Sequence, residues 1–178
     1  MKKVVIISSS PQKDGNSEIL AQKFAEGAIA AANMVHIFYV RDIGLKFCTG
    51  CLYCQSHEKC ILNDGMNELY DTIQQADAVV LATPVYYYSV CGQLKTFLDR
   101  LNPLYPRANN FKDFYLLATS AEDDEHTMDG TITAVQGFID CFEGCTLKGV
   151  IKGAGVTEKG DINKTKFPSL AYEAGENV

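Results

Sequence analysis

Short, nearly continuous apolar runs recur along the chain and constrain its fold more than any other feature. They are rich in branched side chains and do not alternate with polar residues, which is typical of parallel strands covered on both faces. The runs occupy residues 4–7, 35–40, 78–82, 114–118 and 146–151. We therefore predict a sheet of five parallel strands.

The segments between these runs place apolar residues at the spacing of one helix face. The faces are Ile19, Leu20, Phe24 and Gly27; Met66, Leu69, Tyr70 and Ile73; Leu94, Phe97, Leu98 and Leu101; and Ile132, Val135, Phe138, Ile139 and Phe142. Because strand and helix alternate, the sequence predicts a doubly wound α/β domain with helices on both faces of the sheet. No repeat or long linker divides the chain, so we expect one domain over residues 1–178.

Composition narrows the class of partner and the compartment. A formal net charge of −6 disfavours nucleic acid or an anionic membrane as the main partner. The apolar part of the opening MKKVVIISSS is too short for a signal peptide, and no later run is long enough to span a bilayer. We therefore expect a cytoplasmic protein with reduced thiols, which disfavours a disulfide framework and favours metal-binding or redox cysteines.

In a doubly wound sheet, ligands bind beyond the carboxyl ends of the strands. The loops that follow the predicted strands occupy residues 8–17, 41–63, 83–90, 119–127 and 152–161. We therefore expect the site residues to lie in these five segments.

The first loop, SSSPQKDGNS, contains neither GxGxxG nor the GK[ST] of a P-loop. It offers serine hydroxyls and Lys13, followed by a helix that starts near Asn16 or Ser17 and points its free N–H groups back into the loop. These hydroxyls and N–H groups can together donate hydrogen bonds to a phosphate dianion. An ordinary N-cap at Asn16 or Ser17 is the alternative, and the position at the end of the first strand favours the phosphate site.

The third loop begins with Thr83, Pro84 and Val85 and continues into Tyr86, Tyr87 and Tyr88. A Thr-Pro turn leading into aromatics presents a flat apolar surface together with backbone amides, and a flavin ring requires both. The alternative is that the tyrosines are partly buried anchors or subunit contacts.

Four of the seven cysteines follow the spacing C-x2-C-x2-C-x5-C, at Cys48, Cys51, Cys54 and Cys60 in a loop over residues 47–63. Zinc sites usually pair two C-x2-C elements across a longer gap, so zinc fits poorly. Iron–sulfur ligation uses three closely spaced thiolates and a fourth nearby. The spacing leaves a cluster, a reversible dithiol and a loop of free thiols open. Three further cysteines, Cys91, Cys141 and Cys145, lie on or beside apolar helix faces and are interpreted as core residues.

Three stretches of the chain resemble a known family. VVIISSSPQKDGNSEILAQKFAEGA resembles the FMN-phosphate loop of flavodoxin-like NAD(P)H-dependent FMN reductases, and TPVYYYSVCGQLKTFLDR is similar to their flavin-ring segment. The cysteine run resembles the compact motif of iron–sulfur flavoproteins, which carry FMN and a [4Fe–4S] cluster. Its continuation CILNDGM departs from many members at Gly65, where they have Asp.

The resemblance implies a five-stranded flavodoxin-like sheet of order 2-1-3-4-5 and a set of cofactor ligands. Near the FMN phosphate it places Ser8, Ser10, Asn16 and Ser17, with Pro11 and Lys13 closing around them. Along the isoalloxazine it places Thr83, Pro84, Val85, Tyr86 and Tyr87, and Ser120 near the ribityl chain or dimethylbenzene side. The implied cluster ligands are Cys48, Cys51, Cys54 and Cys60, and no catalytic acid or base is expected.

The resemblance further implies an FMN-dependent oxidoreductase that takes electrons from NAD(P)H and passes them to a small acceptor, with a ferredoxin-type donor as a further partner. A cluster-free NAD(P)H:quinone reductase and a flavodoxin-like electron carrier are the alternatives, and the first loop, which is not of the flavodoxin T/S-x-T-G-x-T type, weighs against the carrier. A homodimer or homotetramer is expected.

Three further loop segments follow the predicted strands. Because the second strand lies beside the first in this order, we expect the cysteine loop to open on the rim of the flavin site, with electrons passing within a subunit or across a subunit contact. The acidic run 122–126 is interpreted as a solvated loop rather than a metal site. We assign no chemical role to the segment GAGVTEKGDINKTK, which follows the last strand.

Overall fold

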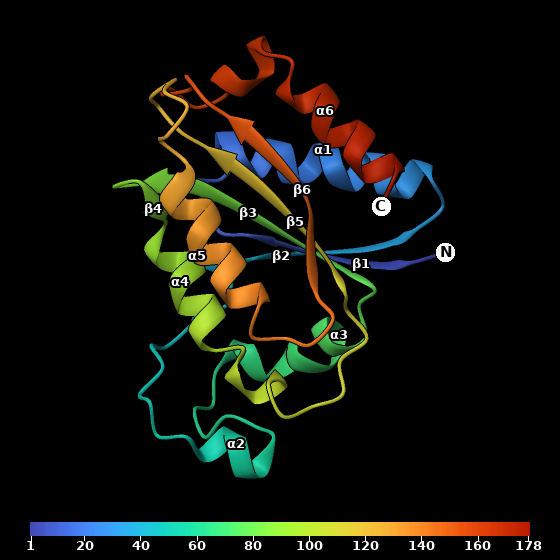
Figure 1. Cartoon of the computed structure of the whole chain (residues 1–178), viewed down its shortest axis with the longest axis vertical. Helices are drawn as coiled ribbons and strands as arrows, with labels where there is room; N and C mark the ends of the chain where they lie inside the picture. The colour runs from blue at the N-terminus through green and yellow to red at the C-terminus, as the bar shows by residue number, and fades with distance from the viewer.

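A computed structural model describes all of residues 1–178 and shows one sheet with helices on both faces (Figure 1). The parallel strands lie in the order β2-β1-β3-β5-β6. Their bounds are β1 Lys3–Ser8, β2 Met34–Tyr39, β3 Ala78–Tyr86, β5 Asp113–Thr119 and β6 Thr146–Gly153. The predicted flavodoxin-like order of the five parallel strands is confirmed.

One further strand was not predicted. Strand β3 continues beyond Ala82 to Tyr86, and β4 (Ser89–Val90) turns back and pairs with it in the antiparallel direction. The two residues of the turn, Tyr87 and Tyr88, both have positive φ, at 50° and 61°. Such a hairpin turn normally uses Asn or Gly, so two tyrosines here hold an unfavourable backbone conformation.

The helices divide between the two faces of the sheet. Their bounds are α1 Asn16–Ala30, α2 Tyr53–His57, α3 Tyr70–Gln74, α4 Gly92–Asp99, α5 Asp129–Ile139 and α6 Phe167–Glu176. Helices α1 and α6 bury Phe24 and Ala171 in one core, and α3, α4 and α5 bury Ile73, Phe97 and Val135 in the other. Strand β1 supplies Val4 and Ile6 to the first core and Val5 and Ile7 to the second, which explains its continuous apolar run.

The second predicted helix face is divided in the structure. A 3₁₀ turn, η2 (Gly65–Glu68), precedes α3, and the side chain of Asp64 caps it by accepting from the N–H of Met66. The predicted side chains Met66, Leu69, Tyr70 and Ile73 are nevertheless buried together.

Helix α6 was not predicted, and it packs along α1 at two glycines. A Cβ added to Gly27 would lie 2.0 Å from the carbonyl oxygen of Tyr172, and one added to Gly175 would lie 2.0 Å from that of Phe24. The helices therefore contact each other through their backbones, which only glycine allows at these positions.

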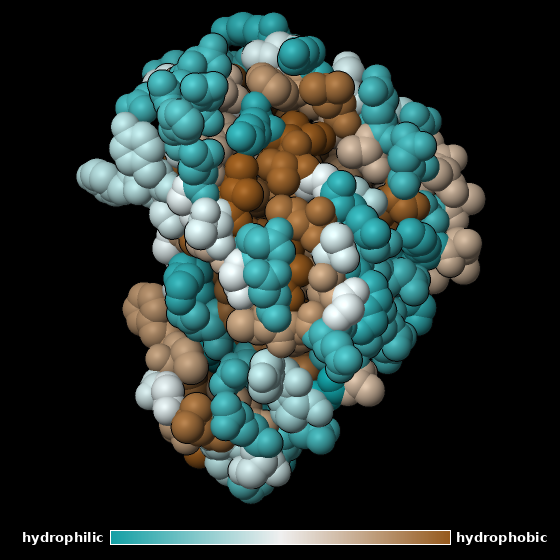
Figure 2. Space-filling model, viewed as in Figure 1, coloured by the Kyte–Doolittle hydropathy of each residue, from teal (hydrophilic) through white to brown (hydrophobic).

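Strand β6 forms one edge of the sheet between α5 and α6. Figure 2 shows apolar surface gathered on this face of the molecule, between more polar borders. A cavity of about 450 Å³ is lined there by Val150, Ile151 and Leu170, among others. No helix in the structure is both long enough and apolar enough to cross a bilayer.

Candidate functional site

The first loop leaves the carboxyl end of β1 and folds back on itself before α1. The N–H and the hydroxyl of Ser9 both donate to the carbonyl of Ala82, at 2.9 and 2.7 Å. The hydroxyl of Ser10 donates to the carbonyl of Gln12 at 2.8 Å. A Cβ added to Gly15 would lie 2.6 Å from the Ser10 hydroxyl, so a glycine keeps this turn closed.

Two serine hydroxyls in this loop are buried and make no hydrogen bond, those of Ser8 and Ser17. Ser17 lies in the first turn of α1, which has no side-chain cap, and the N–H groups of Asn16, Ser17 and Glu18 donate to no backbone acceptor. A buried hydroxyl without a partner costs roughly 1–3 kcal/mol. These donors therefore suit a bound anion with several acceptor oxygens, which is the chemistry of a phosphate.

A cavity of about 240 Å³ opens beside these donors, at the carboxyl edge of the sheet. Its walls come from the first loop, the end of β3 and the segments that follow β5 and β6. The lining residues are Ser10, Gln12, Gly15, Asn16, Ser17, Pro84, Val85, Tyr86, Thr119, Ser120, Ala121, Val156 and Thr157. Seven of the twelve residues predicted to bind FMN therefore meet in one cavity: Ser10, Asn16, Ser17, Pro84, Val85, Tyr86 and Ser120.

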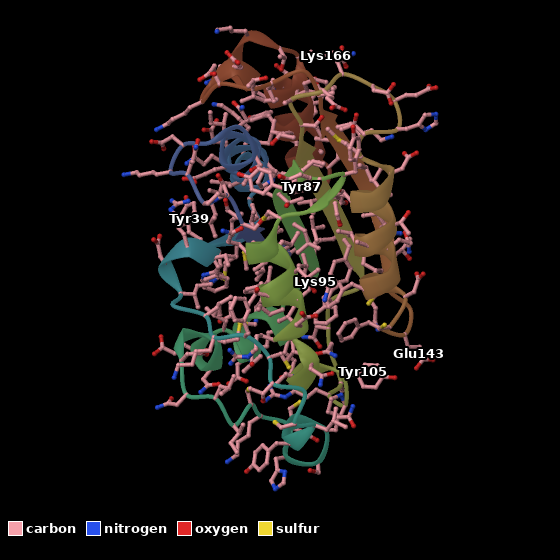
Figure 3. All side chains as sticks on the ribbon, turned by 90° about the vertical axis from the view of Figure 1, so that its left-hand side faces the viewer. Tyr39, Tyr87, Lys95, Tyr105, Glu143 and Lys166 are labelled. Atoms are coloured by element: carbon pink, nitrogen blue, oxygen red, sulfur yellow. The ribbon has the colours of Figure 1, made fainter.

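The other five predicted residues lie around the cavity without lining it. Ser8 is buried beneath the loop, and Pro11 and Lys13 are exposed. Thr83 is buried, and its hydroxyl donates to the carbonyl of Pro84 and accepts from the N–H of Cys91. Tyr87 is fully exposed at the tip of the hairpin (Figure 3).

Asn16 has a contact that its sequence did not predict. Its side-chain oxygen accepts from the N–H groups of Gly160 and Ile162 at 3.0 and 3.2 Å, and its amide donates to the carbonyl of Glu158 at 3.0 Å. The side chain thus fastens the segment after β6 to the first loop. Val156 and Thr157 of that segment line the cavity, although the sequence analysis gave the segment no chemistry.

An ion pair between the buried carboxylate of Glu18 and the partly buried Arg41 supports the first loop. Glu18, in the first turn of α1, receives both terminal nitrogens of Arg41, at 2.5 and 3.2 Å. Arg41 also donates to the carbonyl of Ser10 at 3.5 Å, and the hydrogen bond to Glu18 raises its pKa. The pair neutralises a carboxylate beside the expected phosphate position. Arg41 was not predicted, because its place directly after β2 at this edge is its one sign of a role in the sequence.

The cysteine loop carries its four thiols in different environments. Cys48 and Cys51 are exposed, Cys60 is half-buried and Cys54 is buried. The Cys54 sulfur accepts from the side-chain amide of Asn102 at 3.2 Å, and the Cys48 sulfur accepts from the N–H of Gly50 at 3.5 Å. Burial raises the pKa of Cys54, whereas hydrogen bonds from the Tyr53 backbone and the Thr49 side chain lower that of Cys51.

The structure contains no converged group of three or more acidic, histidine or cysteine side chains of the kind that holds a metal ion. The four predicted ligands share one loop and are not drawn together into such a group. In donor number and type they suit a cluster, since four thiolates bind [4Fe–4S] and N–H groups donate to their sulfurs. Their role as ligands stays a prediction.

The position of the cysteine loop differs from the sequence-based expectation. The loop starts beside the cavity, where Arg41 contacts Ser10, yet Cys54 contacts Asn102, which follows the carboxyl end of α4. Cys91, just before α4, contacts Ser9 of the first loop. The thiols and the cavity thus lie at opposite ends of α4, about 12 Å of helix apart, with α2 and the β4 hairpin well separated in Figure 1.

The two ends of the cysteine loop meet at a buried ion pair. Arg100 binds Asp64 with both terminal nitrogens, at 2.6 and 2.9 Å, and the side chains are 1% and 4% exposed. Burial opposes the charge of Asp64, but hydrogen bonds from Arg100 and from the N–H groups of Lys46 and Met66 outweigh it and lower its pKa.

The acidic run 122–126 lies beside the hairpin. Tyr88 donates its hydroxyl to Glu122 at 2.9 Å, which raises the pKa of Tyr88, and His126 contacts Asp129 at 2.9 Å. No metal site is formed there. The interpretation as a solvent-facing loop is consistent with the exposure of residues 121–126.

Comparison with known proteins gives a consistent set of matches. The sequence model of the family described as NADPH-dependent FMN reductase matches residues 2–146. An iron–sulfur flavoprotein of Archaeoglobus fulgidus is 39% identical over 104 residues, which cover 57% of this chain and 46% of that protein. One from Methanocaldococcus jannaschii is 37% identical over 103 residues, with 57% and 53% covered. The chain thus spans about half the length of the curated relatives it matches.

Solved structures show the same fold. The NAD(P)H:quinone oxidoreductase from Methanothermobacter marburgensis superimposes with a TM-score of 0.78 at 18% identity, over 99% of this chain and 95% of that one. An azoreductase from Bacillus anthracis gives 0.76 at 14% identity, with both chains fully covered. At such low identity the likeness concerns the fold alone.

Proposed function

The chain belongs to the NADPH-dependent FMN reductase family, and from that membership we propose that it binds FMN in the cavity at the carboxyl edge of the sheet and transfers electrons from a reduced nicotinamide to a small acceptor. The observation that carries the proposal is the buried, unpartnered hydroxyl of Ser17, which lies in the first turn of α1 with its free N–H groups and lines a cavity whose wall includes Pro84 and Val85.

The residues around the cavity have distinct roles in this proposal. Ser10 and Ser17, with the first N–H groups of α1, bind the phosphate, and Lys13 at the loop surface adds a positive charge. Pro84, Val85 and Tyr86 form the wall for the ring, and Thr119 and Ser120 face it from the segment after β5.

FMN, when bound, supplies hydride and single-electron chemistry. Tyr86 is the only titratable side chain that lines the cavity, and burial raises its pKa, so its hydroxyl stays protonated at neutral pH. In this proposal the protein binds and orients the ring, and the Tyr86 hydroxyl can donate a hydrogen bond but cannot act as a base at neutral pH.

Two measurements test the flavin proposal. The first is fluorescence titration of FMN with the flavin-free protein, for which we expect saturable quenching at one site per chain. The second is anaerobic addition of NADH or NADPH to the flavin-loaded protein, for which we expect bleaching of the flavin absorption. Failure to bind FMN would refute the proposal, and binding without bleaching by either nucleotide would favour the electron carrier.

The cysteine loop supports a finer proposal, that Cys48, Cys51, Cys54 and Cys60 hold a [4Fe–4S] cluster. Supporting it are the four-thiol spacing, the N–H groups of Asn102 and Gly50 that point to two of the sulfurs, and relatives named iron–sulfur flavoproteins. A cluster exchanges electrons one at a time, so a ferredoxin-type protein is a suitable partner. Iron and sulfide counts on anaerobically prepared protein test this, and iron near zero would favour a cluster-free NAD(P)H:quinone reductase.

We further propose a homodimer or homotetramer that works in a reducing compartment, the cytoplasm. Such an assembly allows electrons to pass between the thiols of one subunit and the cavity of another across a subunit contact, as well as within a subunit. The apolar surface beside β6 and the exposed Tyr87 are available for such a contact. Sedimentation velocity tests the assembly, and a monomer at micromolar concentration would contradict it.

A further inference from the structure

The carboxyl end of α4 carries a buried arginine whose side chain serves the cysteine loop and not the sheet. Besides its two bonds to Asp64, Arg100 donates from Nη1 to the carbonyl of Lys46 at 2.7 Å. Lys46 precedes the first thiol of the loop by two residues, and Asp64 follows the last by four. One guanidinium therefore binds both ends of the segment that carries the four thiols.

The two ends of this segment also bind each other. The N–H of Lys46 donates to the carboxylate of Asp64 at 3.0 Å. Beside this bond, a Cβ added to Gly65 would lie 2.3 Å from the carbonyl oxygen of Ile43, so the two backbones are in direct contact there. Residues 47–63 thus form a ring that is closed at its base by a buried ion pair, and closing a loop in advance removes part of the entropy cost of ordering its ligands.

Two surface contacts hold the far side of the ring. Asn102 donates to the Cys54 sulfur at 3.2 Å, and Arg107 donates from its Nε to the carbonyl of Glu58 at 3.1 Å. Both come from the segment directly after Arg100. The chain between α4 and β5 therefore acts as one support for the loop, with Arg100 as its buried member.

One hydrogen-bond donor of Arg100 has no partner. Its Nε is buried and has no hydrogen-bond partner, while both terminal nitrogens are engaged. The side chain is 1% exposed, so solvent does not reach it. A buried N–H without an acceptor costs free energy, and a ligand atom that arrives from the loop would recover it.

We propose that Arg100 is a positioning residue for the cluster: it fixes the span of the ring through Lys46 and Asp64, and its unpartnered Nε–H is a donor for a sulfur of the ring when the four thiolates bind iron. This rests on the proposed [4Fe–4S] function. Outer contacts of this kind orient metal ligands, and their loss typically lowers metal retention by about 10–100-fold. The competing view is that the ion pair only stabilises the fold.

The first experiment removes the pair without leaving a buried charge. In the double variant Asp64→Leu with Arg100→Met, two apolar side chains replace the pair, a change that often leaves a fold as stable as before. We expect wild-type FMN affinity and a folded chain whose unfolding temperature falls only by the loss of the Asp64 cap, together with iron loss to a chelator at least about tenfold faster than in the wild type. Lys95→Gln, which breaks only an exposed pair with Asp99 on the same helix, is the matched control and should lose iron at the wild-type rate.

The outcomes separate the two proposals. A folded double variant that retains iron as well as the wild type would overturn the role of Arg100. If the wild type itself takes up no iron, the cluster proposal fails. The role of Arg100 in closing the ring is then tested in the iron-free protein. There the buried Cys54 of the double variant should react with a thiol reagent about tenfold faster than that of the wild type. An unchanged rate would overturn this role.

The conservative variant Arg100→Lys tests the proposed bond from Nε to a sulfur of the ring. Lysine keeps the positive charge for Asp64 but cannot reproduce the guanidinium fork together with a third donor. We expect it to hold iron while the reduction potential and the electron paramagnetic resonance spectrum of the reduced cluster change, since hydrogen bonds to sulfur set both. A purely structural role would leave both unchanged, and that result would overturn the proposed bond.

Discussion

At the scale of single residues, the hydroxyl of Ser17 is buried in the first turn of α1 and has no partner within the protein. Alanine would suit this helical position better, because it has the higher helix propensity and no polar atom to leave unpaired. The fold alone does not explain this serine, whereas the proposed phosphate would accept its hydrogen bond. Ser9 differs, because its hydroxyl donates to Ala82 and links β1 to β3.

This contrast gives the first prediction. Ser17→Ala should weaken FMN binding about tenfold or more, since a hydrogen bond to a charged group contributes roughly 1.5–3 kcal/mol, while the flavin-free protein becomes no less stable. Ser9→Ala should instead lower the free energy of unfolding by about 1 kcal/mol. FMN titration and urea unfolding of both variants measure the two quantities. Equal FMN affinity in Ser17→Ala and wild type would contradict the phosphate site.

The Asp64 carboxylate gives a second prediction, on pH. Its pKa in the folded protein is below its ordinary value of 3.8, so its contribution to stability is fully present above that pH and is lost as the pH falls through the lower, folded value. Asp64→Asn leaves Arg100 buried without its counter-charge and should cost about 3–5 kcal/mol at pH 7. Urea unfolding at pH 7 and pH ~3 should show this difference shrink at the lower pH. A difference that does not change with pH would contradict the assignment.

At the scale of elements, α6 shows why a helix can be missed in a sequence. Its buried residues are Ala171 and Gly175, so it presents no stripe of large apolar side chains. It is held by close backbone contact with α1 at Gly27 and Gly175. Small residues at a helix crossing can be recognised as a packing surface only when the partner helix is known.

The crossing gives a third prediction. Gly27→Ala should lower the free energy of unfolding by about 2 kcal/mol or more, because the new methyl group would overlap the Tyr172 carbonyl and force the helices apart. Gly137→Ala is the matched control, since Gly137 lies in α5 with open space around it and should gain about 0.5–1 kcal/mol. Urea unfolding of both measures this. Similar effects in the two variants would show that helix propensity alone is at work.

The β3–β4 hairpin gives a fourth prediction. Tyr87 is fully exposed and has φ of 50°, a conformation that asparagine adopts with less strain. Tyr87→Asn should therefore raise the free energy of unfolding of the flavin-free protein by about 0.5–1 kcal/mol. If Tyr87 also contacts the ring, as its sequence position predicts, FMN affinity falls in the same variant. Loss of stability would show that the tyrosine makes a packing contact.

At the scale of the whole molecule, the cavity and the thiols lie at opposite ends of α4, each with its own supports. The cavity rests on the first loop, β3 and the segments after β5 and β6, and the cysteine ring rests on Arg100, Asn102 and Arg107. No residue that lines the cavity belongs to residues 47–63. Mutations in the cysteine ring should therefore leave the cavity unchanged.

A fifth prediction follows from this separation. Replacing Cys48, Cys51, Cys54 and Cys60 together by serine should leave the FMN dissociation constant within about threefold of the wild-type value, since additivity holds for distant sites. Fluorescence titration on single chains, at concentrations where no assembly forms, measures it. A loss of FMN binding under these conditions would show that the loop reaches the cavity.

The sequence predicted the fold better than the site. Near-continuous apolar runs require strands covered on both faces, and local patterns were enough to locate all five of the parallel strands. The hydroxyl loop and the Thr-Pro-Val-Tyr segment were recognisable because each site segment is contiguous in the chain. Arg41, Val156 and Thr157 were not recognised, because their roles depend on contacts between distant segments, such as those of Asn16 with Gly160 and Ile162.

What the sequence determined by itself is therefore the parallel sheet and the succession of its elements along the chain, since both follow from the burial of local patterns; the edge at which a ligand is expected then follows from the doubly wound topology. Only the tertiary structure decided where the thiols lie. A loop over residues 47–63 has no apolar pattern to fix its direction, and its place at the far end of α4 is set by the ion pair between Asp64 and Arg100, which lie 36 residues apart in the chain.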